Sequence, residues 1–100
     1  MTYTIFTAPQ FNEIYTNLDG REQQWIETVK KNLEEAITGK MLHFRWFREK
    51  RNNGKRLYYL IDEEQKKILL VTFTTKKEQQ KTIDEILRNM KELFIYLRSL

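Results

Sequence analysis

The chain has no cysteine and very few residues that break regular structure. Among its 100 residues are no Cys, three Gly, one Pro and one His. Without thiols the chain can form neither a disulfide nor a thiolate metal site. Scarce glycine and proline predict long helices and strands joined by short loops. No glycine-rich loop of the kind that holds nucleotide phosphates is present, and we expect neither a cofactor nor a metal.

Long apolar runs are absent as well. No stretch approaches the ~20 apolar residues of a membrane span, and the first ten residues lack the charged start and apolar segment of a signal peptide. No linker, repeat or low-complexity segment is visible. Hydrophobic residues make up 40% of the chain and aromatic residues 13%, which is enough to fill a core. We therefore expect one domain over residues 1–100, in a cytoplasmic protein without membrane contact.

Charge is divided unevenly along the chain, whose formal net charge is +4. Residues 1–38 carry three basic and six acidic side chains, a net charge of −3. Residues 39–100 carry fifteen basic and eight acidic side chains, a net charge of +7. Localised positive charge is typical of a surface that binds nucleic acid. The alternative is that these cations only solvate the surface.

The spacing of apolar residues predicts an α+β protein with the element order β-α-α-β-β-β-α. Alternation predicts a first strand over residues 3–6. Helical spacing then predicts two helices, the first of which begins with Thr7 as its cap. Asp19 and Glu22 predict a capping box at the start of the second helix, and Gly39 is expected at its C-terminal end.

Three further strands and a final helix follow. Strands and tight turns are expected to alternate at residues 42–51, 52–54, 55–62, 63–66 and 67–75. Thr82 and Glu85 predict a capping box that opens the last helix. Strands joined by tight turns predict an antiparallel sheet. The helices are expected to pack on one of its faces and to leave the other face partly open.

Counting alternate residues from the two tight turns assigns each side chain to a face of the sheet. The apolar face is expected to hold Phe47, Leu57, Tyr59, Ile61, Leu69, Val71 and Phe73. The open face is expected to hold Trp46, Arg48, Lys50, Arg56, Tyr58, Thr72, Thr74 and Lys76. Cations pair with phosphates and aromatic rings stack on unpaired bases, so the open face suits RNA. The alternative is that its aromatic residues cover a small second cluster.

Two motifs in the second half of the chain resemble those of a known family. Arg56-Leu57-Tyr58-Tyr59 resembles the "yRiiY" strand of the RelE/ParE superfamily of toxins from toxin–antitoxin pairs. Residues 76–82, with the sequence KKEQQKT, resemble the "F-x-K-K-x-x-x-K-T" ending of its HigB-like members. The order of elements is similar over most of the chain, and the resemblance therefore implies a RelE-like fold.

The resemblance implies a ribosome-dependent endonuclease that enters the ribosomal A site and cleaves mRNA with the RNA 2′-hydroxyl as nucleophile. It also implies a cognate antitoxin as partner, and a monomer or weak dimer without it. Arg56 matches the arginine that stabilises the reacting phosphate. Lys76 and Lys77 match basic residues expected to transfer protons or contact phosphate, and Arg48 is expected to position the substrate. Further RNA contacts are expected from Arg45, Trp46, Lys50, Arg51, Lys55, Tyr58 and Lys81, with Tyr58 as the stacking group.

Other interpretations stay open. The family often has a tyrosine or histidine near the C-terminal end, and this sequence has neither between Phe73 and Leu93. A ParE-like inhibitor of DNA gyrase without nuclease activity, and a non-catalytic RNA-binding module, are therefore the alternatives. His43 has no carboxylate neighbour in the sequence that would favour a role as general base. The acidic residues at 62–64 are expected to form a solvated hairpin tip and no metal site.

Overall fold

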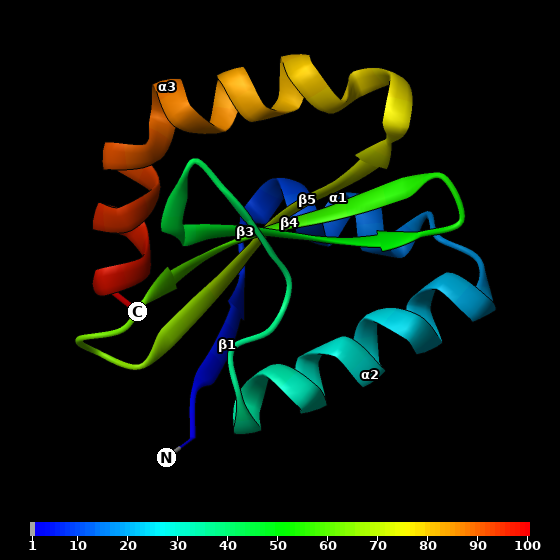
Figure 1. The fold of residues 1–100 in the computed structure, drawn as a ribbon. Coiled ribbons are helices and arrows are strands. Elements are labelled where there is room, and N and C mark those ends of the chain that lie inside the picture. The colour runs from blue at the N-terminus through cyan, green and yellow to red at the C-terminus, as the bar shows by residue number, and fades with distance from the viewer. Residues whose placement is uncertain (1) are drawn as a thin grey trace.

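The computed structural model describes residues 2–100, which form one five-stranded sheet with three α-helices (Figure 1). The strands are β1 (Thr4–Thr7), β2 (Lys40–Leu42), β3 (Phe44–Asn52), β4 (Lys55–Asp62) and β5 (Lys67–Thr75). The helices are α1 (Pro9–Thr16), α2 (Gly20–Glu35), the single 3₁₀ turn η1 (Lys76–Glu78) and α3 (Gln79–Arg98). The predicted α+β class is confirmed. Within residues 2–100, no helix is long and apolar enough to cross a membrane.

The sheet is mixed, and the prediction of an antiparallel sheet is wrong in this respect. The strand order is β1-β5-β4-β3-β2, and β1 pairs parallel with β5 while the other pairs are antiparallel. β2 is also additional to the predicted element order. It has only three residues and pairs irregularly with β3, which leaves too short a stretch for alternation to reveal.

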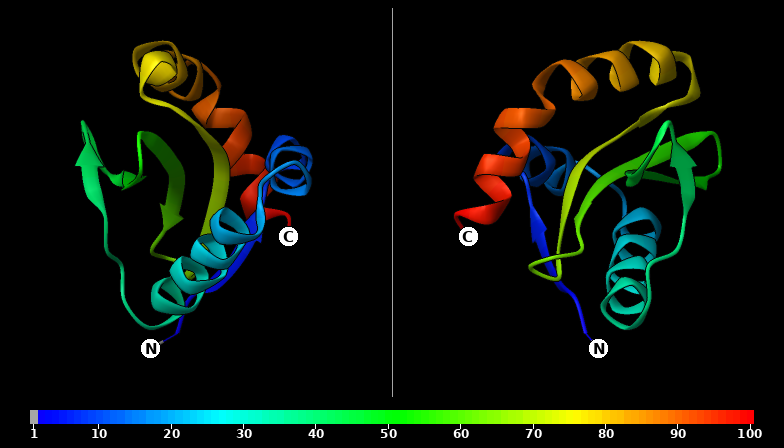
Figure 2. Two further views of the ribbon diagram at one scale, coloured as in Figure 1. Left: turned by 90° about the vertical axis from the view of Figure 1, so that its right-hand side faces the viewer. Right: turned by 60° about the vertical axis from the view of Figure 1, so that its left-hand side comes forward.

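Helices cover both faces of the sheet, so the expectation of one partly open face is also wrong. Helices α1 and α2 pack on the face that holds Leu57, Tyr59 and Ile61, and α3 packs on the face that holds Tyr58 and Leu60. Figure 1 and Figure 2 show α2 and α3 on different sides of the strands. The physical reason lies in β4, whose residues from 57 to 61 are all buried. A continuous apolar run of this kind belongs to a strand covered on both faces.

Two local features shift the side chains relative to the predicted faces. The turn after β3 has two residues, Asn53 and Gly54, both with positive φ, as a type I′ hairpin turn requires. The predicted turn has three residues, and the shift of one residue moves Arg48 and Lys50 to the face of α2. In addition, a bulge in β5 at Val71 places Leu69 and Val71 on the face of α3, whereas Ile68 and Leu70 lie on the face of α1 and α2. Each slip by one residue exchanges the faces of all residues beyond it.

The predicted helix ends are right at one position and wrong at three. Asp19 and Glu22 form the expected capping box. Thr7 does not cap α1, because its hydroxyl donates to Asn12 Oδ1 over 2.7 Å. Gly39 lies beyond the end of α2, which stops at Glu35. Thr82 lies inside α3, which begins at Gln79, and is buried 3.4 Å from the hydroxyl of Thr74.

Candidate nucleic-acid interface

The structure divides the basic residues predicted for RNA contact between the two ends of β3. The β3–β4 hairpin and η1 meet at one end, where the backbone N–H of Lys76 donates to the carbonyl of Gly54 over 2.8 Å. This cationic end comprises Arg51, Arg56, Lys76, Lys77 and Lys81. Arg45 and Trp46 lie near the opposite end of β3. Their separation from Arg51, about six residues along a strand, corresponds to roughly 20 Å.

Arg45 and Trp46 make contacts within the protein. The guanidinium of Arg45 lies 3.5 Å from the carboxylate of Glu63 in an exposed ion pair. Trp46 stacks on Phe44 with 4.6 Å between the ring centroids, and the edge of Phe94 approaches it at 5.3 Å. Trp46 thus packs against α3, at the other end of β3 from the cationic end.

Arg48, Lys50 and Lys55 lie on the face that α2 covers. Arg48 donates from Nε to the carbonyl of Arg45 over 2.9 Å and from a terminal nitrogen to the carbonyl of Gly39 over 3.2 Å. Lys55 forms a 2.6 Å ion pair with Glu22 at the start of α2. Lys50 is half-buried and pairs across the sheet with Leu57. These three residues are therefore separated from Arg56 by the sheet, contrary to the expected shared face.

Arg56 lies just below the surface of the cationic end. Its cross-strand partners are Arg51 on β3 and Thr74 on β5. Only 7% of the Arg56 side chain is exposed, and its Nε lies 3.6 Å from Oε2 of Glu49, whose side chain is completely buried. Gln79, in the first turn of α3, donates to the other oxygen of Glu49 over 3.3 Å. The acid therefore neutralises the guanidinium at the junction of β3, β4 and α3.

Tyr58 completes this buried cluster. Its ring is fully buried, so the tyrosine predicted to stack on a base has no exposed face. Burial raises the pKa of Tyr58 to about 12, with a further increase from the charge of Glu49 and a decrease from Arg56. The Tyr58 hydroxyl, Arg56 Nε and Glu49 Oε2 are all buried without a hydrogen-bond partner.

Sequence reasoning missed Glu49 and Gln79. In the sequence, Glu49 is one charge among several in a basic strand. Its signal is its position, because it alternates with Phe47 and therefore points to the same face as an apolar core residue. A charged residue in such a position is almost always paired. With the correct two-residue turn, the basic residue next to it on β4 is Arg56. For Gln79 we find no signal in the sequence.

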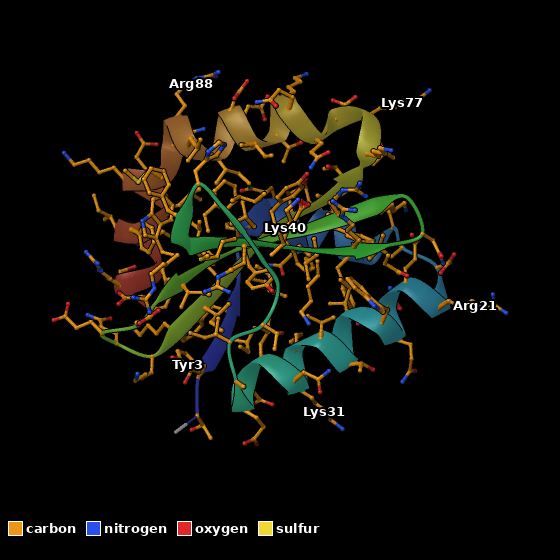
Figure 3. All side chains as sticks on the ribbon, viewed as in Figure 1. Tyr3, Arg21, Lys31, Lys40, Lys77 and Arg88 are labelled. Carbon is orange, nitrogen blue, oxygen red and sulfur yellow. The ribbon has the colours of Figure 1, made fainter. Side chains whose placement is uncertain are left out.

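The remaining cations of this end are exposed. Arg51, Lys76, Lys77 and Lys81 all lie on the surface. Figure 3 places Lys77 in the turn that leads into α3, on the opposite side of the molecule from Lys31 of α2. Exposed charges on flexible side chains, arranged around one rigid and nearly buried arginine, can bind a chain of phosphates. Among residues 2–100, no cluster of His, Cys, Asp and Glu could hold a metal ion.

Several solved structures have the same architecture. A mutant of the Escherichia coli toxin RelE in the free state superposes with a TM-score of 0.72 at 14% identity, over 88% of this chain and 98% of that one. The toxin–antitoxin complex RelBE2 of Mycobacterium tuberculosis gives 0.64 at 19% identity, over 75% and 99% of the two chains. The RelE–RelB complex of Pyrococcus horikoshii gives 0.63 at 15% identity, over 75% and 96%.

These similarities define the fold as that of bacterial and archaeal toxins of the RelE kind. The RelE-like fold that the sequence motifs implied is thereby confirmed. No protein-family model and no curated protein sequence matches the chain. The likeness therefore lies in the course of the backbone, whereas the chemistry depends on the side chains of this chain.

Proposed function

We propose that the chain is the toxin of a toxin–antitoxin pair and an endoribonuclease that cleaves mRNA on the ribosome. The observation that carries the proposal is the cationic end on a RelE toxin fold, with exposed Lys76 and Lys77 beside the nearly buried Arg56. Rigid arginine and flexible lysines at one end of a sheet are the groups that phosphate chemistry needs.

The proposed reaction requires little covalent participation by the protein. The 2′-hydroxyl of the RNA attacks the adjacent phosphorus while the bond to the 5′-oxygen breaks, and the demand is alignment and stabilisation of the negative charge. Arg56 donates to the phosphate oxygens. Lys76 and Lys77 contact phosphate or transfer the protons of the attacking and leaving oxygens.

The positioning role expected for Arg48 passes to Arg51 in this proposal. Arg48 donates to two backbone carbonyls on the face of α2, whereas Arg51 is exposed and lies directly across from Arg56. Lys81, in the first turn of α3, adds a further interaction with the RNA backbone. Arg45, Trp46, Lys50 and Lys55 lie outside the proposed catalytic region.

The proposed partner is a cognate antitoxin that neutralises the toxin in the cytoplasm. The structures from M. tuberculosis and P. horikoshii are complexes of a toxin with its antitoxin, and they support the same arrangement here. We propose that the chain without its antitoxin is a monomer or a weak dimer.

The proposal is tested by mRNA cleavage in a reconstituted translation system, with and without ribosomes. Arg56→Ala alone is a poor probe, because it leaves the buried charge of Glu49 without its partner and destabilises the fold. We therefore choose the double variant Lys76→Gln and Lys77→Gln, with Lys30→Gln and Lys31→Gln on α2 as the matched control. Both remove two neighbouring positive charges.

We expect ribosome-dependent cuts from the wild type and the control. The variant at 76 and 77 should cleave at least about tenfold more slowly, and roughly 100-fold or more if either lysine transfers a proton. Cuts at the wild-type rate from that variant would contradict the site. Absence of cuts from the wild type would contradict the nuclease function itself.

A second candidate function is inhibition of DNA gyrase, as in ParE-like members. It is favoured by one observation, that the segment between Phe73 and Leu93 holds no tyrosine or histidine that could transfer protons at neutral pH. Under this alternative, expression of the chain causes DNA damage and leaves mRNA intact. A non-catalytic RNA-binding module would cause neither and would still bind RNA through the cationic end.

A further inference from the structure

Glu49 is a buried acid that the proposed reaction does not use. Its side chain is completely buried, which is rare for a glutamate unless a partner holds it. It lies on β3 two residues before Arg51 and directly across from Tyr58. From there it faces the guanidinium of Arg56, and its charge offsets the repulsion between Arg51 and Arg56, which are direct cross-strand neighbours.

The pair of Glu49 and Arg56 is an ion pair without a hydrogen bond. The 3.6 Å between Oε2 and Nε exceeds the roughly 2.7–2.9 Å of charge-assisted hydrogen bonds. Neither atom has another hydrogen-bond partner, and the hydroxyl of Tyr58 beside them has none either. Buried polar atoms in this state are costly, and a ligand that satisfies the donors recovers the cost. Two of the three groups, Arg56 Nε and the Tyr58 hydroxyl, can donate to an anion.

We propose that Glu49 is an internal competitor for Arg56, whose carboxylate holds the guanidinium until an RNA phosphate replaces it. The inference rests on the proposed function in that the ligand is an RNA phosphate. Glu49 does not contact the reacting atoms and is a positioning residue. It keeps Arg56 at the edge of the core, and it lowers the affinity of the cationic end for RNA, because a phosphate that binds Arg56 must first replace the carboxylate. Gln79 fixes the carboxylate from the other side.

The test is a binding measurement that requires neither ribosomes nor cleavage. The probe is a 2′-O-methyl RNA oligonucleotide of about ten nucleotides, a usual site size for single strands, and it lacks the nucleophilic hydroxyl. Fluorescence anisotropy gives the affinity of the wild type, Glu49→Gln, Arg56→Gln and the double variant. Glu49→Gln keeps the shape of the side chain and its contact with Gln79 while the charge is removed.

We expect Glu49→Gln to bind the probe about three- to tenfold more tightly than the wild type, in the range of one charge-assisted interaction. The increase in affinity should disappear in the Arg56→Gln background, because it acts through Arg56. The matched control is Glu78→Gln, which removes one exposed negative charge beside Lys77. Glu78→Gln should increase the affinity for the probe by a smaller factor, and this increase should persist in the Arg56→Gln background.

The inference is overturned if Glu49→Gln binds no more tightly than the wild type, or if its increase in affinity persists without Arg56. A second readout uses the unaltered protein, in case a variant does not fold. The Nε–H NMR signal of Arg56 should shift as the probe is added. The inference is equally overturned if this signal stays unchanged while the amide signals of Lys76 and Lys77 show that the probe is fully bound. If the chain does not cleave mRNA but Glu49→Gln binds the probe more tightly through Arg56, only the proposed function is refuted. If the chain cleaves mRNA but Glu49→Gln does not change the affinity, only this inference is refuted.

Discussion

Tyr58 and Tyr59 are neighbours on β4 whose hydroxyl groups lie in different surroundings. Both rings are fully buried, on opposite faces of the sheet. The Tyr59 hydroxyl donates to the carbonyl of Thr38 over 2.5 Å, whereas the Tyr58 hydroxyl has no partner. Burial is the main cause that raises the pKa of both phenols. The two residues thus provide a matched comparison of a satisfied and an unsatisfied buried hydroxyl.

We expect Tyr58→Phe to leave the free energy of unfolding unchanged or to raise it by up to about 1 kcal/mol, because it removes an unpaired polar group. Tyr59→Phe should lower it by about 1 kcal/mol because its hydrogen bond is removed. Urea unfolding near neutral pH measures both. Equal effects of the two substitutions would contradict the difference in hydrogen bonding.

The same measurement at alkaline pH provides a check on Tyr58. Its pKa in the folded chain is about 12, above the roughly 10 of an unfolded chain. The unfolded chain therefore loses this proton at lower pH than the folded chain. The free energy of unfolding is unaffected by the Tyr58 phenol below about pH 10 and falls as the pH rises towards 12. The loss should be smaller in Tyr58→Phe, which has one phenol fewer to ionise.

At the scale of elements, α3 is the helix that determines what the sheet can expose. Ile83, Ile86 and Leu97 bury the face that holds Tyr58, and the first turn of the helix supplies Gln79 to the cluster around Arg56. The opposite end of α3 is fixed by Arg98, whose Nε donates to the buried carboxylate of Asp62 over 2.8 Å. Packing of this one helix therefore links the core, the cationic end and the β4–β5 turn.

We expect Asp62→Asn to loosen the C-terminal end of α3 and to lower the free energy of unfolding by about 1.5 kcal/mol, the lower end of the range for hydrogen bonds to a charged group. Burial by itself would raise the pKa of Asp62, but hydrogen bonds from Arg98 and from the backbone of Gln65 leave it below 3.8. The ionised Asp62 carboxylate thus stabilises the folded chain fully above about pH 4. This stabilisation is lost as the pH falls through the pKa of Asp62 in the folded chain.

Hydrogen exchange of the α3 amides and urea unfolding as a function of pH measure these effects. The variant should show a shallower loss of stability in acid than the wild type. Asp84→Asn on the exposed side of α3 is the control, since Asp84 only accepts a hydrogen bond from Gln80 on the same helix. A wild-type acid profile in Asp62→Asn would contradict the role of the pair with Arg98.

At the scale of the whole molecule, the excess of positive charge belongs to the part of the chain that follows α2. Residues 1–38 have a net charge of −3 and residues 39–100 one of +7, and Lys77 and Lys31 lie on opposite sides of the protein (Figure 3). A charge distribution of this kind orients a polyanion before contact and makes its binding depend on salt.

We expect the logarithm of the affinity for the 2′-O-methyl RNA probe to fall linearly with the logarithm of salt concentration. Lys76→Gln with Lys77→Gln should reduce the magnitude of that slope by about 0.7 for each phosphate that the variant no longer neutralises. Lys30→Gln with Lys31→Gln removes the same charge from α2 and should leave the slope unchanged. Equal slopes for all three proteins would show that RNA binds elsewhere.

Much of this architecture follows from local sequence. The extents predicted for β4 and β5, residues 55–62 and 67–75, agree with the structure because long runs of β-branched and aromatic residues end at strong turn signals. The capping box of Asp19 is likewise a contact within one turn. The motifs around Arg56 and Lys76 correctly implied the RelE-like fold, and the chain connectivity brings these two residues to the same end of the sheet.

Only the tertiary structure decided which side chains share a face. A hairpin turn of two residues instead of three and a bulge at Val71 exchange the faces of whole segments. Asn53-Gly54 is a sequence signal for a two-residue turn, but the bulge is not visible in the alternation of a strand that is apolar on both sides. The face of the sheet on which α3 packs is likewise not determined by its sequence, because its apolar stripe could pack on either apolar face. The contact between Glu49 and Arg56 depends on the strand register, because strand pairing determines which buried charge each residue meets.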